Sequence, residues 1–164
     1  MAWKNESRRH ALASKGVKTA VNSKPVAVDL RRYQGKWFDV GHYPQSFQRD
    51  CVTSIAEYKK TKSGIDVKNT CVKKDGAKSS ISGSANIIPP DTLGVSFFPF
   101  FSSPYKVEWV DKNYERAIVG HPEKKNLWFL SRKQSLSNKK LERMKKIAKN
   151  KGYSPSKLTK VKQK

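Results

Sequence analysis

The sequence predicts an all-β chain, namely an eight-stranded antiparallel up-and-down β-barrel with one C-terminal α-helix packed on its outside. Eight short stretches rich in apolar, β-branched and aromatic residues follow one another, and some alternate strictly between apolar and polar side chains. The connections between them are short, as antiparallel neighbours allow. Apolar residues recur at helical spacing only near the end of the chain. Because a row of eight strands leaves two unpaired edges unless it closes, we expect a barrel.

The first segment differs from the rest. Residues 1–25 mix Lys, Arg, Ser, Asn and Ala without a core pattern, which predicts a flexible basic N-terminal arm. The 164 residues are enough for one domain with a real core. We therefore assign residues 26–164 to a single barrel domain with a basic C-terminal tail.

The strands are predicted from alternation and from the turn residues between them. Ile65 and Val67 fall on one face of their stretch, and Asp66 and Lys68 fall on the other. An Asp-Gly pair within residues 73–78 is a hairpin-turn signal. The predicted strands cover residues 36–43, 52–60, 65–73, 81–88, 93–98, 105–110, 116–120 and 127–132.

One helix is predicted at about residues 137–151. Ser137 is a suitable N-cap, and Gly152 fits the position after the last turn. The apolar stripe indicates a face that docks on the sheet. This stripe consists of Leu141, Met144, Ile147 and Ala148.

Positive charge is concentrated at the two ends of the chain. The formal net charge is +22. Residues 1–25 hold six basic and one acidic group, and residues 139–164 hold eleven and one. Such charge favours anionic partners, including phospholipid headgroups and nucleic acid, although it also serves solubility alone.

Several kinds of site and several locations are disfavoured by what the sequence lacks. No apolar run approaches the roughly 18 residues of a membrane span, and residues 1–25 contain no apolar stretch typical of a secretory signal. No Cys precedes Cys51, so a lipoprotein-type anchor is not expected, and we expect a cytoplasmic protein or one peripheral to a membrane. The three His residues show no zinc-binding spacing. We expect no metal and no cofactor.

Three motifs occur in order along the predicted strands. Gly35 and Trp37 form a Gly-x-Trp at the first strand, Asp111 and Tyr114 bound a turn, and Arg132 ends the last strand. Together they resemble the signature of the lipocalin family. The segment from about residue 28 to about residue 162 is similar to the bacterial and plant temperature-induced lipocalins, which are relatives of apolipoprotein D. The resemblance implies that Trp37 plugs the closed end of the barrel, with Arg132 across its indole and bonded to nearby carbonyls.

The barrel places one unusual segment at its open end. In an up-and-down barrel, alternate connections share an end, so residues 44–50, 73–77, 97–105 and 121–125 are expected together. The third of these is strongly aromatic, with the sequence FFPFFSSPY. Phe97 is expected to fill the interior. Phe100, Phe101 and Tyr105 are expected to contact a ligand or to touch a membrane.

The alternation of strand residues also predicts the cavity wall. Inward positions are mostly apolar with a few hydroxyl and amide groups, a character that suits a fatty acid, a lysophospholipid or a similar lipid. The candidate ligand-binding residues are Phe47, Ser54, Ala56, Tyr58, Val67, Asn69, Phe97, Phe100, Phe101, Tyr105, Val107, Trp109, Ile118 and Trp128.

The two cysteines lie on neighbouring strands. Cys51 opens one predicted strand and Cys71 lies near the end of the next, so they are nearly opposite across one hairpin. A disulfide between them and a pair of reduced thiols both remain open, the second being favoured in a cytosol.

Two functions compete. The first is a lipocalin that binds or transports a small hydrophobic ligand, with peripheral contact to an anionic membrane, as a monomer or homodimer. The second is a basic protein that binds nucleic acid or another polyanion and uses the barrel as a scaffold. It ranks lower because no strand interleaves basic and aromatic residues in an RNA-binding pattern. An enzyme is not expected, since the sequence holds no nucleophile elbow, metal motif or phosphate loop.

Overall fold

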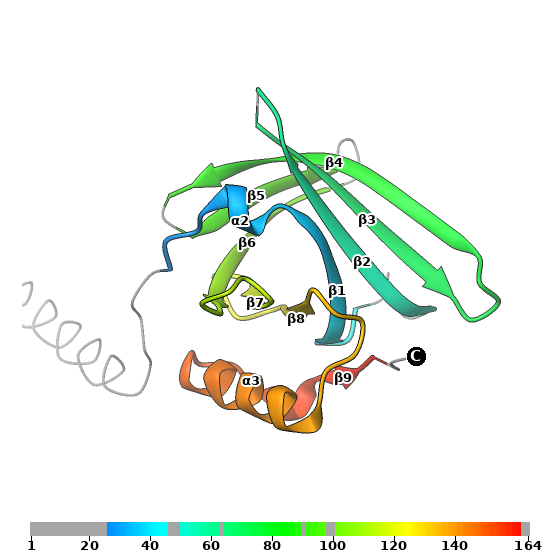
Figure 1. The fold of residues 1–164 in the computed structure, drawn as a ribbon, viewed down its shortest axis with the longest axis vertical. Coiled ribbons are helices and arrows are strands. Elements are labelled where there is room, and N and C mark those ends of the chain that lie inside the picture. Colours follow the sequence, from blue (N-terminus) through cyan, green and yellow to red (C-terminus); the bar gives the residue numbers. More distant parts are fainter. Residues whose placement is uncertain (1–25, 46–49, 63, 90, 98–100, 162–164) are drawn as a thin grey trace, which may run out of the picture.

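Eight of the nine strands in the described structure are those the alternation indicates, with shifts at their ends (Figure 1). The computed structural model describes residues 26–45, 50–62, 64–89, 91–97 and 101–161. The strands are β1 (Gly35–His42), β2 (Cys51–Lys60), β3 (Ile65–Lys73), β4 (Lys78–Ile88), β5 (Thr92–Phe97), β6 (Phe101–Val110), β7 (Arg116–Gly120), β8 (Leu127–Ser131) and β9 (Thr159–Lys160). The helices are α2 (Leu30–Tyr33), α3 (Asn138–Asn150) and the 3-10 turn η2 (Pro155–Lys157).

The sheet closes on itself. Each strand from β2 to β8 pairs antiparallel with the next, and β1 pairs with both β8 and β2. The predicted eight-stranded barrel is therefore confirmed. The short strand β9 is an addition that the sequence did not indicate, and it pairs with the end of β1 through His42 and Thr159.

The aromatic segment is the main difference from the expected strand boundaries. β6 begins at Phe101 rather than at Tyr105, and Phe101 pairs directly with Phe97. The expectation that the connection between these strands extends to residue 104 is therefore wrong, since residues 101–104 belong to β6. Pro104 explains why the sequence does not indicate the start of β6. A proline has no backbone N–H to donate to a β-ladder, so it usually signals the end of a strand. The sheet nevertheless accommodates Pro104, which stands opposite Gly94.

Helix α3 packs on the outside of the barrel, as expected (Figure 1). The Ser137 side chain accepts a hydrogen bond from the Lys140 backbone, and this caps the first turn. At the other end Gly152 has a φ of 95°, and Tyr153 N donates to Ala148 O. This bond belongs to a Schellman motif, which turns the chain back toward the barrel.

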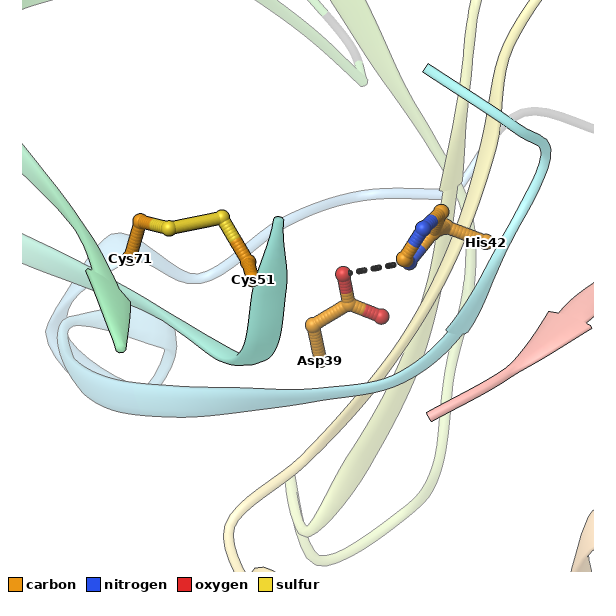
Figure 2. Close-up of a disulfide and its surroundings, with 4 residues drawn as sticks. All are labelled: Asp39, His42, Cys51 and Cys71. Carbon is orange, nitrogen blue, oxygen red and sulfur yellow. Dashed lines mark hydrogen bonds and ion pairs between the residues drawn. A yellow bond between two sulfur atoms is a disulfide. The ribbon is translucent and has the colours of Figure 1, made fainter. Parts of the chain in front are cut away.

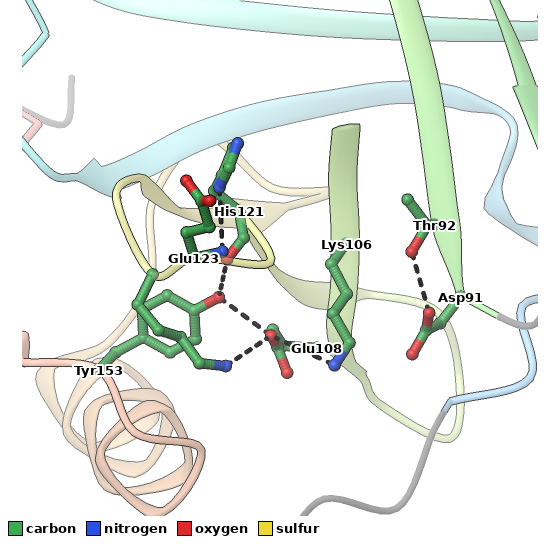
Figure 3. A network of polar contacts seen from close by, with 8 residues as sticks. Asp91, Thr92, Lys106, Glu108, His121, Glu123 and Tyr153 are labelled. Carbon is green, nitrogen blue, oxygen red and sulfur yellow. Dashed lines mark hydrogen bonds and ion pairs between the residues drawn. The ribbon is translucent and has the colours of Figure 1, made fainter. Parts of the chain in front are cut away.

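A polar network fixes the segment after α3 to the barrel wall (Figure 3). The Tyr153 hydroxyl donates to Glu108 Oε1 at 3.0 Å, and Lys124 Nζ lies 3.1 Å from the same oxygen. Glu108 is only 4% exposed, and a buried charge is costly unless it is paired. These contacts, together with Lys106 Nζ at 3.9 Å, compensate the charge.

Two apolar clusters result from this arrangement. One fills the interior of the barrel, and the other lies between the outer face of the wall and α3.

No helix in the described part of the chain is long and apolar enough to span a bilayer. The expected limit between arm and domain at residue 26 stays a prediction.

Candidate functional site

One end of the barrel is sealed by Trp37. Its indole is fully buried, and its Nε1 donates to Tyr33 O at 2.7 Å. The Arg132 guanidinium lies 3.7 Å from the ring centroid, which is a close cation–π contact. The same guanidinium donates at 2.8–3.2 Å to the carbonyls of Arg32, Tyr33, Lys36 and Tyr114.

The turn between β6 and β7 completes this closed end. The Asp111 carboxylate accepts from the Glu115 backbone at 2.7 Å and from Arg116 Nε at 3.1 Å. Tyr114 has a φ of 55°, and its hydroxyl accepts from Asp29 N. Gly35 also has a positive φ, of 102°, and a Cβ there would lie 3.3 Å from Arg132. The motif residues thus hold the closed end of the barrel together, as the sequence resemblance implies.

The barrel contains a cavity of about 280 Å³. This volume is near the lower end of the roughly 300–1,000 Å³ that is common for ligand pockets, so it suits one slender molecule. On β2 the lining extends from Cys51 to Tyr58, which corresponds to about 23 Å along the strand at about 3.3 Å per residue. The cavity is therefore long and narrow.

The wall changes character along its length. Tyr58 stands opposite Val67 on β3, and the next inward row toward Cys51 pairs Ala56 with Asn69. In the row beyond Ala56 and Asn69, Ser54 faces Cys71, which in turn faces Ser79 on β4. The end of the cavity toward Tyr58 is therefore apolar apart from the phenol, and the end toward Cys51 carries hydroxyl, amide and sulfur groups.

Two aromatic pairs flank the apolar part. Tyr105 and Trp128 lie with ring centroids 5.1 Å apart, and both line the cavity. Tyr58 packs against Tyr33, with the two ring centroids 5.3 Å apart. Burial raises the pKa of Tyr58 and of Tyr105, so both phenols are neutral at physiological pH.

The structure brings most of the described candidate residues to the cavity wall. Those that line it are Ser54, Ala56, Tyr58, Val67, Asn69, Phe97, Tyr105 and Trp128. Phe47 and Phe100 lie outside the described residues, as does the side chain of Phe101. That any of these residues binds a ligand stays a prediction.

Three other candidates are placed differently. Trp109 and Ile118 belong to the cluster between the wall and α3, so the expectation that they face the cavity is wrong. The register of β6 against β7 shifts between Val107 and Trp109, and a shift of one residue exchanges the two faces of a strand. Val107 is fully buried in the interior cluster but is not part of the cavity wall.

Residues that the sequence reasoning missed also line the cavity. They include Asp39, Val119 and Leu130. Alternation within a strand was a sufficient signal for two of them, because Asp39 lies two residues after Trp37 and Leu130 lies two residues after Trp128. Val119 was missed because its strand was assigned the opposite phase.

A disulfide and a buried hydrogen bond between Asp39 and His42 lie near Cys51, at the cavity wall (Figure 2). Cys51 and Cys71 are joined, with their Cα atoms 5.3 Å apart. Asp39 Oδ2 lies 2.8 Å from His42 Nδ1. No group of three or more His, Cys, Asp or Glu side chains in the described ranges is arranged to hold a metal ion.

Comparison with known proteins agrees with this geometry. The family model described as a lipocalin-like domain matches residues 28–163. The chain belongs to the lipocalin family. Lipocalins generally bind or transport small hydrophobic ligands and are not, as a rule, enzymes.

The similar relatives come from a virus, bacteria, plants and animals. The outer membrane lipoprotein Blc of Vibrio cholerae is 33% identical over 85% of this chain and 86% of its own length. Temperature-induced lipocalin-1 of Arabidopsis thaliana is 30% identical over 83% and 80%, and apolipoprotein D of Cavia porcellus is 30% identical over 80% and 75%. The relationship indicated by the sequence motifs is thus confirmed.

A solved structure supports the fold alone. Insecticyanin of Manduca sexta superposes with a TM-score of 0.71 over 86% of this chain and 84% of its own. Its sequence identity is 23%, so the likeness concerns the barrel of this lipocalin and not its ligand.

Proposed function

We propose that this lipocalin binds and carries one long-chain hydrophobic molecule, such as a fatty acid, a lysophospholipid or a similar lipid, in its barrel cavity. The observation that supports the proposal most is a narrow cavity, apolar over much of its length, in a barrel that Trp37 closes at one end. Burying an acyl chain there removes apolar surface from water, at about 25 cal/mol per Å².

Contact with an anionic membrane is the second part of the proposal. A carrier of membrane lipids must meet a bilayer, and a strongly basic protein is attracted to anionic headgroups. Helix α3 exposes a row of cations on the face turned away from the barrel. These are Lys139, Lys140, Arg143, Lys146 and Lys149.

The same row of cations supports the alternative function. A protein with a net charge of +22 also attracts nucleic acid, whose binding weakens steeply as salt rises. Both functions involve affinity for anions, but only the first involves uptake of a lipid into the cavity. Uptake is therefore the property to measure.

Quenching of tryptophan fluorescence by a fatty acid brominated along its chain tests the uptake. Trp128 lines the cavity, whereas Trp109 lies in the cluster outside the wall. We expect saturable quenching at one molecule per barrel, and we expect Trp128→Phe to remove most of it. The matched control Trp109→Phe should keep it. If quenching does not saturate while a short DNA duplex binds stoichiometrically in 150 mM salt, the polyanion function is the correct one.

A further inference from the structure

One side-chain oxygen in the cavity wall is left unpaired by the fold. Asn69 lines the cavity on β3, and its Oδ1 is buried without a hydrogen-bond partner in the described structure. Such an oxygen is unusual, because most buried polar atoms in proteins are paired and an unpaired one costs free energy. An amide of this kind at a cavity wall is a contact point for a donor on the molecule that the cavity holds.

Apolar side chains surround this amide. Asn69 stands opposite Ala56 on β2 and opposite Ile81 on β4, and both of these also line the cavity. Two residues along β3, Val67 belongs to the same wall. The row of Ala56, Asn69 and Ile81 therefore holds one polar side chain between two apolar ones. A hydrogen bond made to it there is shielded from water, and this strengthens the bond.

Asn69 lies partway along the cavity and not at either end. Its partner Ala56 is on β2, along which the lining extends from Cys51 to Tyr58. At about 3.3 Å per residue, Ala56 lies about 7 Å from the Tyr58 end and about 16 Å from the Cys51 end. The amide thus divides the length of the cavity into a short and a long part.

The short part belongs to the closed end, because Tyr33 packs against both Tyr58 and the Trp37 plug. A lipid that enters tail first has about five or six carbons beyond Asn69, since bonds of about 1.5 Å in a zigzag chain advance about 1.3 Å each. An unsubstituted chain would cover the amide, exclude water and leave the oxygen unpaired. A hydroxyl group at that carbon would donate to Oδ1 after rotation of the terminal amide, whose torsion is soft.

We propose that Asn69 makes the cavity selective for lipids that carry a hydroxyl group partway along the acyl chain, about six carbons from the methyl end. This inference rests on the proposed lipid-binding function and narrows it to oxygenated acyl chains. A hydroxyl group both donates and accepts, so it matches the oxygen and the nitrogen of the amide. In an eighteen-carbon acid the rest of the chain spans about 14 Å, which brings the carboxylate near the Cys51 end.

Three fatty acids that differ only in one hydroxyl group test this selectivity. Octadecanoate, 12-hydroxyoctadecanoate and 2-hydroxyoctadecanoate are titrated to displace the brominated fatty acid from the full-length protein, and recovery of Trp128 fluorescence is followed. We expect the 12-hydroxy acid to act at about three- to tenfold lower concentration than octadecanoate, the effect of one buried hydrogen bond. The 2-hydroxy acid should resemble octadecanoate, because its hydroxyl group stays beside the carboxylate. Equal displacement by all three, or a preference for octadecanoate, would overturn the inference.

Variants separate recognition by Asn69 from a structural role. Asn69→Leu keeps the size of the side chain and removes its polar atoms, so the 12-hydroxy acid would bury its hydroxyl group unpaired. The order should therefore reverse, with octadecanoate the tighter ligand. A merely structural role would instead weaken all three acids alike and keep their order. The matched control Asn86→Leu makes the same exchange at an exposed position of β4 and should keep the wild-type order.

The possible failures are distinct. If the three acids bind but Asn69→Leu keeps the preference for the 12-hydroxy acid, the inference is wrong while lipid binding stands. If none of them displaces the brominated fatty acid and that acid itself does not quench saturably, the proposed function falls together with the inference. Should Asn69→Leu fail to fold by circular dichroism, the order of the three acids on the wild-type protein decides the matter.

Discussion

At the scale of single residues, Arg132 joins the parts of the closed end. Its four carbonyl partners belong to α2, the start of β1 and the turn between β6 and β7. Its guanidinium also covers the Trp37 indole, so the same side chain secures the plug of the barrel. A planar group with five donors can serve all these partners at once, and a lysine ammonium cannot.

We predict that Arg132→Lys lowers the free energy of unfolding by about 2–4 kcal/mol, because several charge-assisted hydrogen bonds are lost and carbonyls are left unpaired. Urea unfolding followed by fluorescence measures the change. The control Arg143→Lys alters an exposed residue of α3 and should stay within about 0.5 kcal/mol of wild type. Equal stability of the two variants would show that the closed end does not depend on Arg132.

At the scale of elements, the docking of α3 depends on a close approach at Gly120. A Cβ built on Gly120 would lie 2.0 Å from the Tyr153 hydroxyl oxygen. That hydroxyl donates to Glu108 at 3.0 Å (Figure 3). A side chain at residue 120 would therefore displace Tyr153 and leave the buried Glu108 with one donor fewer.

We predict that Gly120→Ala destabilises the protein by about 2–3 kcal/mol and changes the near-ultraviolet circular dichroism of the aromatic residues around α3. Gly41→Ala is the matched control, since the nearest atoms to its new Cβ lie at 3.8 Å and 4.0 Å. It should remain within about 0.5–1 kcal/mol of wild type, the general cost of such a change. A Gly120→Ala variant as stable as this control would contradict the tight docking.

The elements also show how far the sequence alone could lead. Strict alternation predicted both ends of β3 correctly, and the cap residues Ser137 and Gly152 predicted α3. Pro104 concealed the first half of β6, because local chemistry argues against a proline in a ladder. Trp109 was assigned to the wrong face because a register shift leaves no local signal in the sequence.

The candidate site was predictable to a similar extent. Residues on regular strands, such as Ala56 and Val67, were assigned to the wall correctly from their parity. The Asp39–His42 pair was not, since nothing in the sequence shows that His42 lies within hydrogen-bond distance of that carboxylate. Pairings that depend on a bulge, such as the one in β1, appear only in three dimensions.

At the scale of the whole molecule, three features act together. The closed sheet removes exposed edges, the Trp37 plug seals one end, and α3 covers part of the outer wall. What remains inside is a narrow cavity with an apolar and a polar half, in a protein whose outer surface is strongly basic. This combination suits a carrier that takes a lipid from an anionic surface and holds it away from water.

The central claim is that one lipid occupies this cavity, and native mass spectrometry after incubation with oleate or 1-oleoylglycerol tests it most directly. We predict one retained lipid per chain in the wild type and none in Ala56→Phe, whose new ring fills the lining position of Ala56. The control Ala77→Phe, on the exposed β3–β4 turn, should retain the lipid. A wild type that retains no lipid, or an Ala56→Phe variant that folds and retains it equally, would contradict the claim.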